Sequence, residues 1–222
     1  MDIELNLSDV RARIARACQR SNREPDKVTL VAVTKGFDMR VIRTAFNCGL
    51  RDFGENRAQE ATGKMEQLAD LRQSIMWHMV GHLQSNKAKI AVQKFDIVHS
   101  VDSVRLAMIL SQYIDNTFPI LLQMNITGEG SKSGFKEEEV LNAIREIEKL
   151  PNLEIKGLMT IAPFVNDPEE IRPVFRRLRE LRDSIGLEHL SMGMTDDFEV
   201  AVEEGATILR IGRAIFGHRR YT

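Results

Sequence analysis

The stretch LVAVTKGF, residues 30–37, has the composition of a buried β-strand that ends in a lysine. Unbroken runs of apolar and β-branched residues are typical of strands that are covered on both faces, as in parallel sheets. An ammonium ion belongs in water, so a buried strand that carries Lys35 at its tip requires a chemical reason. Lys35 is therefore the first candidate functional residue.

Seven further strand-like runs follow along the chain, and patterns of helical period lie between them. The predicted strands cover residues 28–34, 50–53, 76–80, 97–100, 120–125, 154–159, 187–192 and 207–211. Predicted helices cover residues 39–48, 138–150 and 169–185. An extra helix at residues 8–21, with Ser8 as its N-cap, precedes the first strand.

This alternation of strands and helices predicts the fold. It indicates parallel strands joined by right-handed crossovers, which is the α/β class. Eight repeats favour a single closed (β/α)8 TIM barrel with an extra N-terminal helix. An open doubly wound sheet is the structural alternative. Because no linker, low-complexity segment or repeat divides the chain, we expect one domain over residues 1–222.

Composition narrows the class of protein. The 222 residues are 43% hydrophobic and 28% charged, and the net charge of −1 lacks the basic surplus of nucleic-acid binders. No run approaches the ~18 apolar residues that cross a bilayer, and the acidic start MDIELNLSDVRARI does not resemble a signal peptide. Cys18 and Cys48 form no CxxC pair and are expected to be reduced, which suits the cytoplasm.

Unusual polar residues cluster directly after the predicted strands. In a barrel these strand ends share one rim, and sites in this fold are built there. The polarity of ordinary loops does not explain why Lys, Arg and Asn abut apolar strands with few generic turn residues. In chain order these positions are Lys35, GEN (54–56), GHLQSNK (81–87), Ser100 with Asp102, Asn125, MTIAP (159–163), SMGMTDD (191–197) and RIGRAIFG (210–217).

The position of Lys35 suggests covalent chemistry. A lysine at the mouth of an apolar barrel loses hydration, which disfavours its charged form. A neutral amine is a nucleophile toward carbonyl carbons, so the position suits a Schiff base. The alternative is a rim lysine that reaches water or pairs with a carboxylate such as Glu55.

The last strand indicates a phosphate site on the same rim. Arg210 ends that strand, Gly212 allows close approach of backbone to a ligand, and the next residues can open a short helix with free N–H groups. The hydroxyl of Thr195 follows the preceding strand. Taken singly, Gly212 is better explained as a turn glycine and Thr195 as a helix N-cap before Asp196. Together with Lys35 they fit a molecule that carries both an aldehyde and a phosphate, which is pyridoxal phosphate (PLP).

Motifs along nearly the whole chain, from about Leu30 to Tyr221, carry a resemblance. They are VAVTK, FGENRAQE, WHMVGHLQSNK, HSVDS, GLMTIAP, LSMGMTDDFEVAVEEGAT and RIGRAIFGHRRY. Together they resemble the pyridoxal phosphate homeostasis protein family, whose fold is similar to the N-terminal barrel of bacterial alanine racemase. The resemblance implies a monomeric barrel with PLP on a lysine and no established catalytic activity. It also implies a role in PLP supply and in the balance of amino and keto acids.

The resemblance also implies roles for particular residues. Lys35 of VAVTK would form the Schiff base, and Asn56 of GEN would lie beside the cofactor. Arg210 would face the pyridine nitrogen. Gly212 and Arg213 would offer backbone N–H groups to the phosphate, and Thr195 its hydroxyl. Many relatives have serine where Thr34 and Thr195 stand here, a difference that retains the hydroxyl.

A PLP-dependent racemase is the alternative function. Arginine is a permanent cation without an acceptor, so Arg210 would keep the ring nitrogen unprotonated and weaken the electron sink. A racemase of this kind also needs a tyrosine base on the opposite face, and the chain has only Tyr113 and Tyr221. The sequence therefore favours a reversible PLP carrier or regulator. Its partners would be PLP-dependent apoenzymes or a regulatory protein; a barrel that acts mainly in protein interaction is a third possibility.

Two other motifs are considered and set aside. His78 and His82 have zinc-ligand spacing, but the glutamate of HExxH is absent, and hydrogen-bonded histidines are the better interpretation. Residues 128–134 partly resemble a phosphate-binding loop, but Phe135 follows Gly134, so a mobile loop is expected. Lys132 in that loop is a hypothetical second acceptor for PLP.

Overall fold

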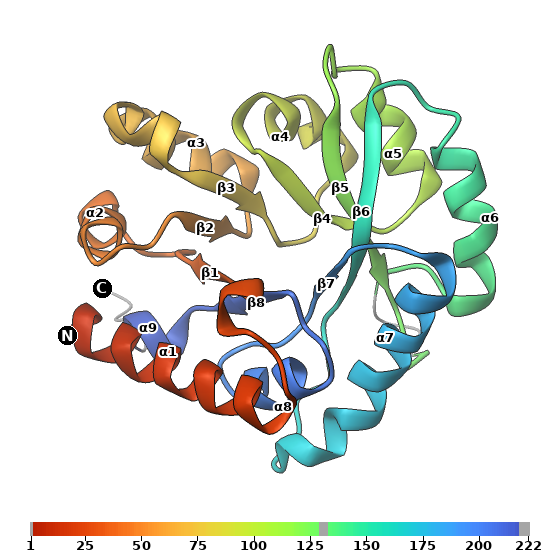
Figure 1. Cartoon of the computed structure of the whole chain (residues 1–222). Coiled ribbons are helices and arrows are strands. Elements are labelled where there is room, and N and C mark those ends of the chain that lie inside the picture. The colour runs from red at the N-terminus through yellow and green to blue at the C-terminus, as the bar shows by residue number, and fades with distance from the viewer. Residues whose placement is uncertain (1, 129–132, 218–222) are drawn as a thin grey trace.

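Eight parallel strands close into a barrel in the computed structural model, which describes residues 2–128 and 133–217 (Figure 1). The strands are β1 (Thr29–Val33), β2 (Asp52–Glu55), β3 (Met76–Met79), β4 (Ile97–Val101), β5 (Phe118–Met124), β6 (Leu153–Thr160), β7 (His189–Ser191) and β8 (Ile208–Ile211). They are ordered as in the chain, and β1 pairs with β8 through Thr29↔Ile208 and Val31↔Arg210. The predicted (β/α)8 barrel is confirmed, and closure between β1 and β8 excludes the open sheet.

Helices surround the barrel and follow its strands. They are α1 (Ile3–Arg20), α2 (Met39–Asn47), α3 (Ala58–Gln67), α4 (Ala88–Lys94), α5 (Val104–Ser111), α6 (Glu137–Ile147), α7 (Arg172–Ile185), α8 (Phe198–Glu203) and α9 (Arg213–Phe216). Each of α2 to α9 lies after a strand, so the loops that follow the strands gather at one end of the barrel. Among the described residues, no helix has the length and apolar character needed to span a membrane.

Helix α1 begins earlier than predicted. Asp2 is its N-cap and accepts a hydrogen bond from the Leu5 N–H at 3.1 Å, whereas Ser8 lies within the helix and was wrongly predicted to cap it. The reason is an apolar stripe that already starts at Ile3 and continues through Leu7. The helix packs along α8 and α9 (Figure 1), and Asn6 donates to the Ile215 carbonyl at 2.9 Å. It thereby supports α9, the short helix after β8.

Other predicted boundaries also differ, three of them clearly. The predicted helix at 169–185 is split into a 3₁₀ turn, η4 (Pro168–Ile171), and the α-helix α7. Pro173 explains the split, because proline lacks an N–H and is tolerated only in the first turn of a helix. Helix α6 ends at Ile147 rather than at residue 150, and β7 spans only His189–Ser191.

The barrel separates two cores. The outer core lies between strands and helices and includes Phe53, Trp77 and Phe175, all buried. The inner cluster consists of Val31, Ile97, Leu121, Met159 and Ile208. Barrel interiors are usually filled by such branched and aliphatic side chains. Here the apolar cluster is small, and the buried polar side chains on the strands include His78, His99, Ser191 and Arg210.

Candidate functional site

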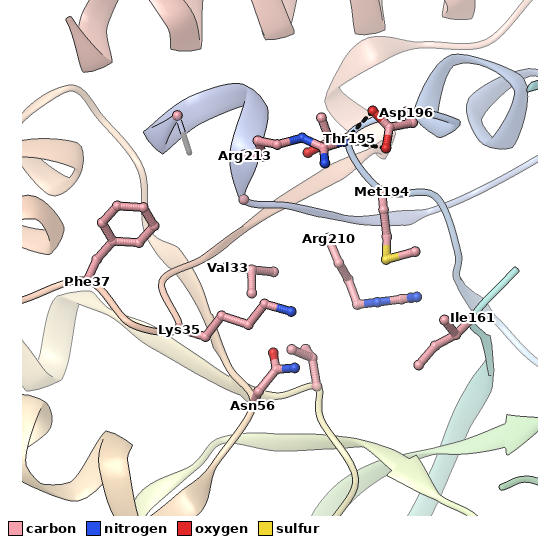
Figure 2. Close-up of a pocket in the computed structure, with 13 residues that line it drawn as sticks. Val33, Lys35, Phe37, Asn56, Ile161, Met194, Thr195, Asp196, Arg210 and Arg213 are labelled. Atoms are coloured by element: carbon pink, nitrogen blue, oxygen red, sulfur yellow. Dashed lines mark hydrogen bonds and ion pairs between the residues drawn. The ribbon is translucent and has the colours of Figure 1, made fainter. Parts of the chain in front are cut away.

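A cavity of about 560 Å³ opens where the strands end, a size typical of small-molecule sites (Figure 2). The residues that line it follow or end β1, β2, β3, β6, β7 and β8. They are Val33, Lys35, Phe37, Asn56, Val80, Ile161, Met194, Thr195, Asp196, Arg210, Gly212, Arg213 and Gly217. All six site residues predicted from the sequence are among them: Lys35, Asn56, Thr195, Arg210, Gly212 and Arg213.

Lys35 stands beyond the last residue of β1 and points into this cavity (Figure 2). The strand before it is buried, but Lys35 itself is exposed, because the strand tip reaches the open rim. The expectation that Lys35 has lost its hydration is therefore wrong for the protein alone. Its exposure agrees with the alternative in which the side chain reaches water. The same exposure leaves the amine accessible to an entering aldehyde.

The main chain on both sides of Lys35 is fixed by helix α3. Lys64 donates from Nζ to the Thr34 carbonyl at 2.9 Å, and Glu60 Oε1 accepts from the Gly36 N–H at 2.9 Å. Lys64 and Glu60 also form an ion pair at 3.2 Å. Sequence reasoning singled out neither residue, although both lie on one helix face four residues apart. Lys64 and Glu60 thus hold the backbone on either side of the candidate amine, and we call this pair the clamp.

Glu55 lies buried next to this clamp. Its Oε1 accepts from the Thr34 hydroxyl at 2.6 Å and from Lys64 Nζ at 2.7 Å. Burial raises the pKa of Glu55, and Lys64 opposes that rise. The cation bound to Glu55 is therefore Lys64, whereas the alternative considered for Lys35 paired Glu55 with Lys35. The difference arises because α3 folds back over the end of β1.

Arg210 occupies the floor of the cavity from within β8. Its Nη1 donates to Ser191 Oγ at 2.7 Å and its Nη2 donates to the Thr160 carbonyl at 2.8 Å. Burial lowers the pKa of Arg210 to about 10, and Asp197 acts in the opposite direction. The guanidinium is therefore still charged at neutral pH. Figure 2 shows the Arg210 side chain and the Lys35 side chain in the same cavity.

Thr195 and Gly212 lie at the side of the cavity next to α9. Thr195 Oγ1 accepts from the Ala214 N–H at 3.3 Å, so the loops after β7 and β8 are joined. The sequence alternative of Thr195 as an N-cap is wrong, because α8 begins at Phe198. A Cβ on Gly212 would lie 3.1 Å from the Val33 carbonyl oxygen, which is tight, so glycine permits this close approach. Arg213 binds Asp196 through its guanidinium.

Asn56 is positioned by the loop after β3. A Cβ at Gly81 would lie 2.3 Å from the Asn56 carbonyl oxygen, a distance that no real side chain tolerates. Only glycine therefore lets this loop pack against the Asn56 backbone. The predicted rim segment GHLQSNK (81–87) thus contributes to the site through Gly81, which has no side chain to obstruct this packing.

The two histidines with zinc-ligand spacing lie in different surroundings. His78 is buried in β3, while His82 is exposed and binds Asp102 at 3.2 Å. Within residues 2–128 and 133–217, no group of three His, Cys, Asp or Glu side chains is arranged to bind a metal. Lys132, the hypothetical second acceptor, and Tyr221 lie outside the described residues.

Comparison with known proteins assigns the family. The family model for the N-terminal domain of alanine racemase matches residues 5–220. A protein of Aquifex aeolicus named pyridoxal phosphate homeostasis protein is 44% identical, with 97% of each chain covered. One of the same name from Pseudomonas aeruginosa is also 44% identical, over 97% of this chain and 95% of its own. The chain belongs to the pyridoxal phosphate homeostasis protein family. The resemblance inferred from the sequence motifs is confirmed.

Solved structures agree with this family assignment. PipY of Synechococcus elongatus, solved with PLP bound, superposes with a TM-score of 0.85 at 34% identity, covering 97% of this chain and all of PipY. Alanine racemase of Corynebacterium glutamicum gives a TM-score of 0.67 at 18% identity. This chain covers 62% of that enzyme, and the likeness shows the fold alone.

Proposed function

We propose that this member of the family binds pyridoxal 5′-phosphate reversibly, as a Schiff base on Lys35, and serves in PLP homeostasis without catalysing a reaction. The observation that carries the proposal is the convergence of six predicted residues on one cavity. An amine, a buried guanidinium and a hydroxyl beside a glycine turn are the groups that an aldehyde, a ring and a phosphate require. The PipY structure with PLP bound supports the same ligand.

The donor set fits PLP in character and in order around the cavity. Lys35 follows β1, and Gly212 and Arg213 follow β8, which is the neighbouring strand. We place the phosphate against Thr195 and the backbone of Gly212 and Arg213, where glycine leaves room for it. Arg210 on the floor would face the ring nitrogen, and Asn56 would lie beside the ring. The cofactor would thus be held at both ends.

The covalent step requires only the amine and the aldehyde. Lys35 Nζ, after losing a proton, attacks the aldehyde carbon, and the C=N bond forms as one water molecule leaves. The reverse reaction with water releases the aldehyde and restores the amine. Because Lys35 lies at the exposed rim, water reaches the linkage. This accessibility suits a protein that binds PLP and later releases it.

The residues around the cavity favour binding over racemisation. Arg210 is the donor in its hydrogen bonds to Ser191 and Thr160, and a guanidinium has no acceptor that would let the ring nitrogen carry a proton. Tyr113 lies between α5 and β5, which is the end of the barrel where strands begin. It therefore stands away from the cavity, which opens where strands end. We infer a monomeric, cytoplasmic, single-domain carrier that passes PLP to apoenzymes or signals to a regulatory protein, and so affects amino- and keto-acid pools.

The purified protein tests the proposal directly. We expect added PLP to produce a yellow complex whose absorption is lost on borohydride treatment, because reduction converts C=N to a stable C–N bond. Peptide mapping should then find the pyridoxyl group on Lys35. Failure to take up PLP, or reduction onto another lysine, would contradict the proposal. Turnover of D- or L-alanine that disappears in Lys35→Ala would instead establish the racemase alternative.

Arg210→Glu tests the role of the guanidinium. A carboxyl group facing the ring nitrogen accepts a hydrogen bond and favours its protonation, so we expect a shifted absorption maximum with the adduct on Lys35 retained. The absorption spectrum of the PLP-loaded variant is the measurement, and circular dichroism checks the fold. Arg43→Gln is the matched control, because its side chain binds Asp70 and does not line the cavity; it should retain the wild-type maximum. Identical spectra for Arg210→Glu and wild type would mean that Arg210 does not face the ring.

A further inference from the structure

A continuous series of polar side chains crosses the inside of the barrel. Asp52 begins β2, His78 and His99 lie in β3 and β4, Ser191 ends β7, and Arg210 lies in β8. Burying polar groups is costly unless each is hydrogen-bonded, and barrels normally fill this space with aliphatic side chains. Packing alone therefore does not account for the choice of residues here.

Each member of the series is within hydrogen-bonding distance of the next. Asp52 Oδ1 lies 3.0 Å from His78 Nε2, and His78 Nδ1 lies 3.0 Å from His99 Nε2. His99 Nδ1 lies 2.8 Å from Ser191 Oγ, which accepts from Arg210 Nη1 at 2.7 Å. The series thus runs from the amino-terminal rim, where the Asp52 side chain is 30% exposed, to the floor of the PLP cavity. We call these five residues the interior chain.

The two ends of the interior chain determine the direction of every hydrogen bond. The Asp52 carboxylate only accepts, so a neutral His78 carries its proton on Nε2 and accepts at Nδ1. His99 must then donate from Nε2, which leaves its Nδ1 as an acceptor for the Ser191 hydroxyl. Arg210 only donates, which matches the remaining lone pair on Ser191 Oγ. With both rings neutral, no other assignment satisfies all four contacts.

The surroundings of His99 agree with a neutral ring. His99 is fully buried, and burial lowers its pKa well below the ordinary value. The positive charge of Arg210 acts in the same direction, as would a charge on His78 or His189. A neutral imidazole of fixed tautomer presents one donor and one acceptor. The hydrogen bonds on the two sides of His99 therefore run in one direction along the interior chain.

We propose that His99 is a positioning residue for Arg210, and that the interior chain fixes the guanidinium in the cavity floor by orienting Ser191 as its acceptor. The Ser191 hydroxyl proton is engaged by His99, so its oxygen lone pair is aimed at Arg210. Without His99 this hydroxyl is free to rotate, and Arg210 retains a defined acceptor only at the Thr160 carbonyl. The consequence for bound PLP rests on the proposed function, because Arg210 is the group placed against the ring.

The protein without cofactor tests the interior chain itself. Nitrogen NMR of histidine-labelled protein should show His99 as a neutral ring protonated at Nε2. Arginine NMR should show separate Nη signals for Arg210, because two hydrogen bonds slow rotation of the guanidinium. We expect these separate signals to be lost in Ser191→Ala and His99→Leu. Protonation of His99 at Nδ1, or unchanged Arg210 signals in both variants, would overturn the proposal.

PLP-loaded variants test the consequence for the cofactor. His99→Gln is the conservative control, since its amide can accept from Ser191 and donate to His78, and it should retain the absorption maximum. His99→Leu should shift that maximum although His99 does not line the cavity. If His99→Leu does not fold, Ser191→Ala provides the same test with a smaller change. Wild-type spectra in folded His99→Leu or Ser191→Ala would contradict the proposal. Failure of wild type to bind PLP would overturn the proposed function, while the cofactor-free measurements would still decide the interior chain.

Discussion

Replacing Lys35 by alanine will abolish the borohydride-stable adduct with PLP, from one per chain in the wild type to none. Among the described residues that line the cavity, Lys35 is the one amine, so the remaining described contacts can hold PLP only without a covalent bond. Lys35 is exposed, so we expect the variant to keep the wild-type stability within about 0.5 kcal/mol. Absorption spectroscopy and peptide mapping measure the adduct, and thermal unfolding measures the stability.

A second rim lysine provides the matched control for this experiment. Lys87 follows β3 on the same rim and donates to Gln59 at 3.0 Å, but it does not line the cavity. Lys87→Ala should therefore retain a full equivalent of adduct. An adduct that persists in Lys35→Ala and disappears in Lys87→Ala would place the PLP elsewhere on the rim.

Replacing Lys64 by methionine will cause the largest loss of stability predicted for a single substitution in this site. The change leaves the buried Glu55 carboxylate without its cation, and its Oε2 already lacks a hydrogen-bond partner in the described structure. Proton uptake by Glu55 limits the damage. From the ordinary pKa of 4.5, neutralising Glu55 at pH 7 costs about 3.4 kcal/mol, at roughly 1.36 kcal/mol per pH unit. We expect a loss of about 3 kcal/mol, measured by urea unfolding.

The loss in Lys64→Met should depend on pH with a definite sign. The folded variant keeps Glu55 protonated through a raised pKa, while the unfolded chain has released that proton. Its stability therefore falls as pH rises above 4.5, by about 1.4 kcal/mol per pH unit, until the raised pKa is passed. Unfolding at pH 5.5 and at pH 7 measures this difference.

Two further variants separate charge from packing in this experiment. Adding Glu55→Gln to Lys64→Met removes the buried charge and should recover much of the lost stability and most of the pH dependence. Lys94→Met replaces a partly exposed lysine that lies 3.8 Å from Glu66, and should change stability by about 0.5 kcal/mol or less. A pH-independent loss in Lys64→Met would mean that packing, and not the Glu55 charge, sets its cost.

The contrast between the two lysines shows where sequence reasoning succeeded. Lys35 was found because it interrupts an apolar pattern at the end of a strand, which is a local feature. Lys64 was missed because it lies among polar residues of an amphipathic helix, where one more lysine gives no signal. Its burial follows from the way α3 packs over β1, which no local pattern encodes.

Some helix boundaries could also have been predicted from local features of the sequence. Pro173 was visible in the sequence, and its missing N–H could have predicted the start of α7 at Arg172. The apolar residues Ile3 and Leu7 could likewise have extended α1 past Ser8. The Glu55 contact is different in kind, because choosing between Lys35 and Lys64 as its partner requires the spatial arrangement of three elements.

The sequence by itself determined the strand–helix alternation, the closed barrel and the six residues around the cavity. Local chemistry and strand order predict the barrel and its functional rim, since the ends of parallel strands in a barrel must share one rim. The selection of Asn56 and Arg213 on that rim rests on the family resemblance. Only the tertiary structure decided that Lys64 neutralises Glu55 and that His78, His99 and Ser191 join Asp52 to Arg210. The physical reason is that hydrogen bonds act over about 3 Å. Contacts so short across a barrel depend on strand register and tilt, which neighbouring residues in the sequence do not specify.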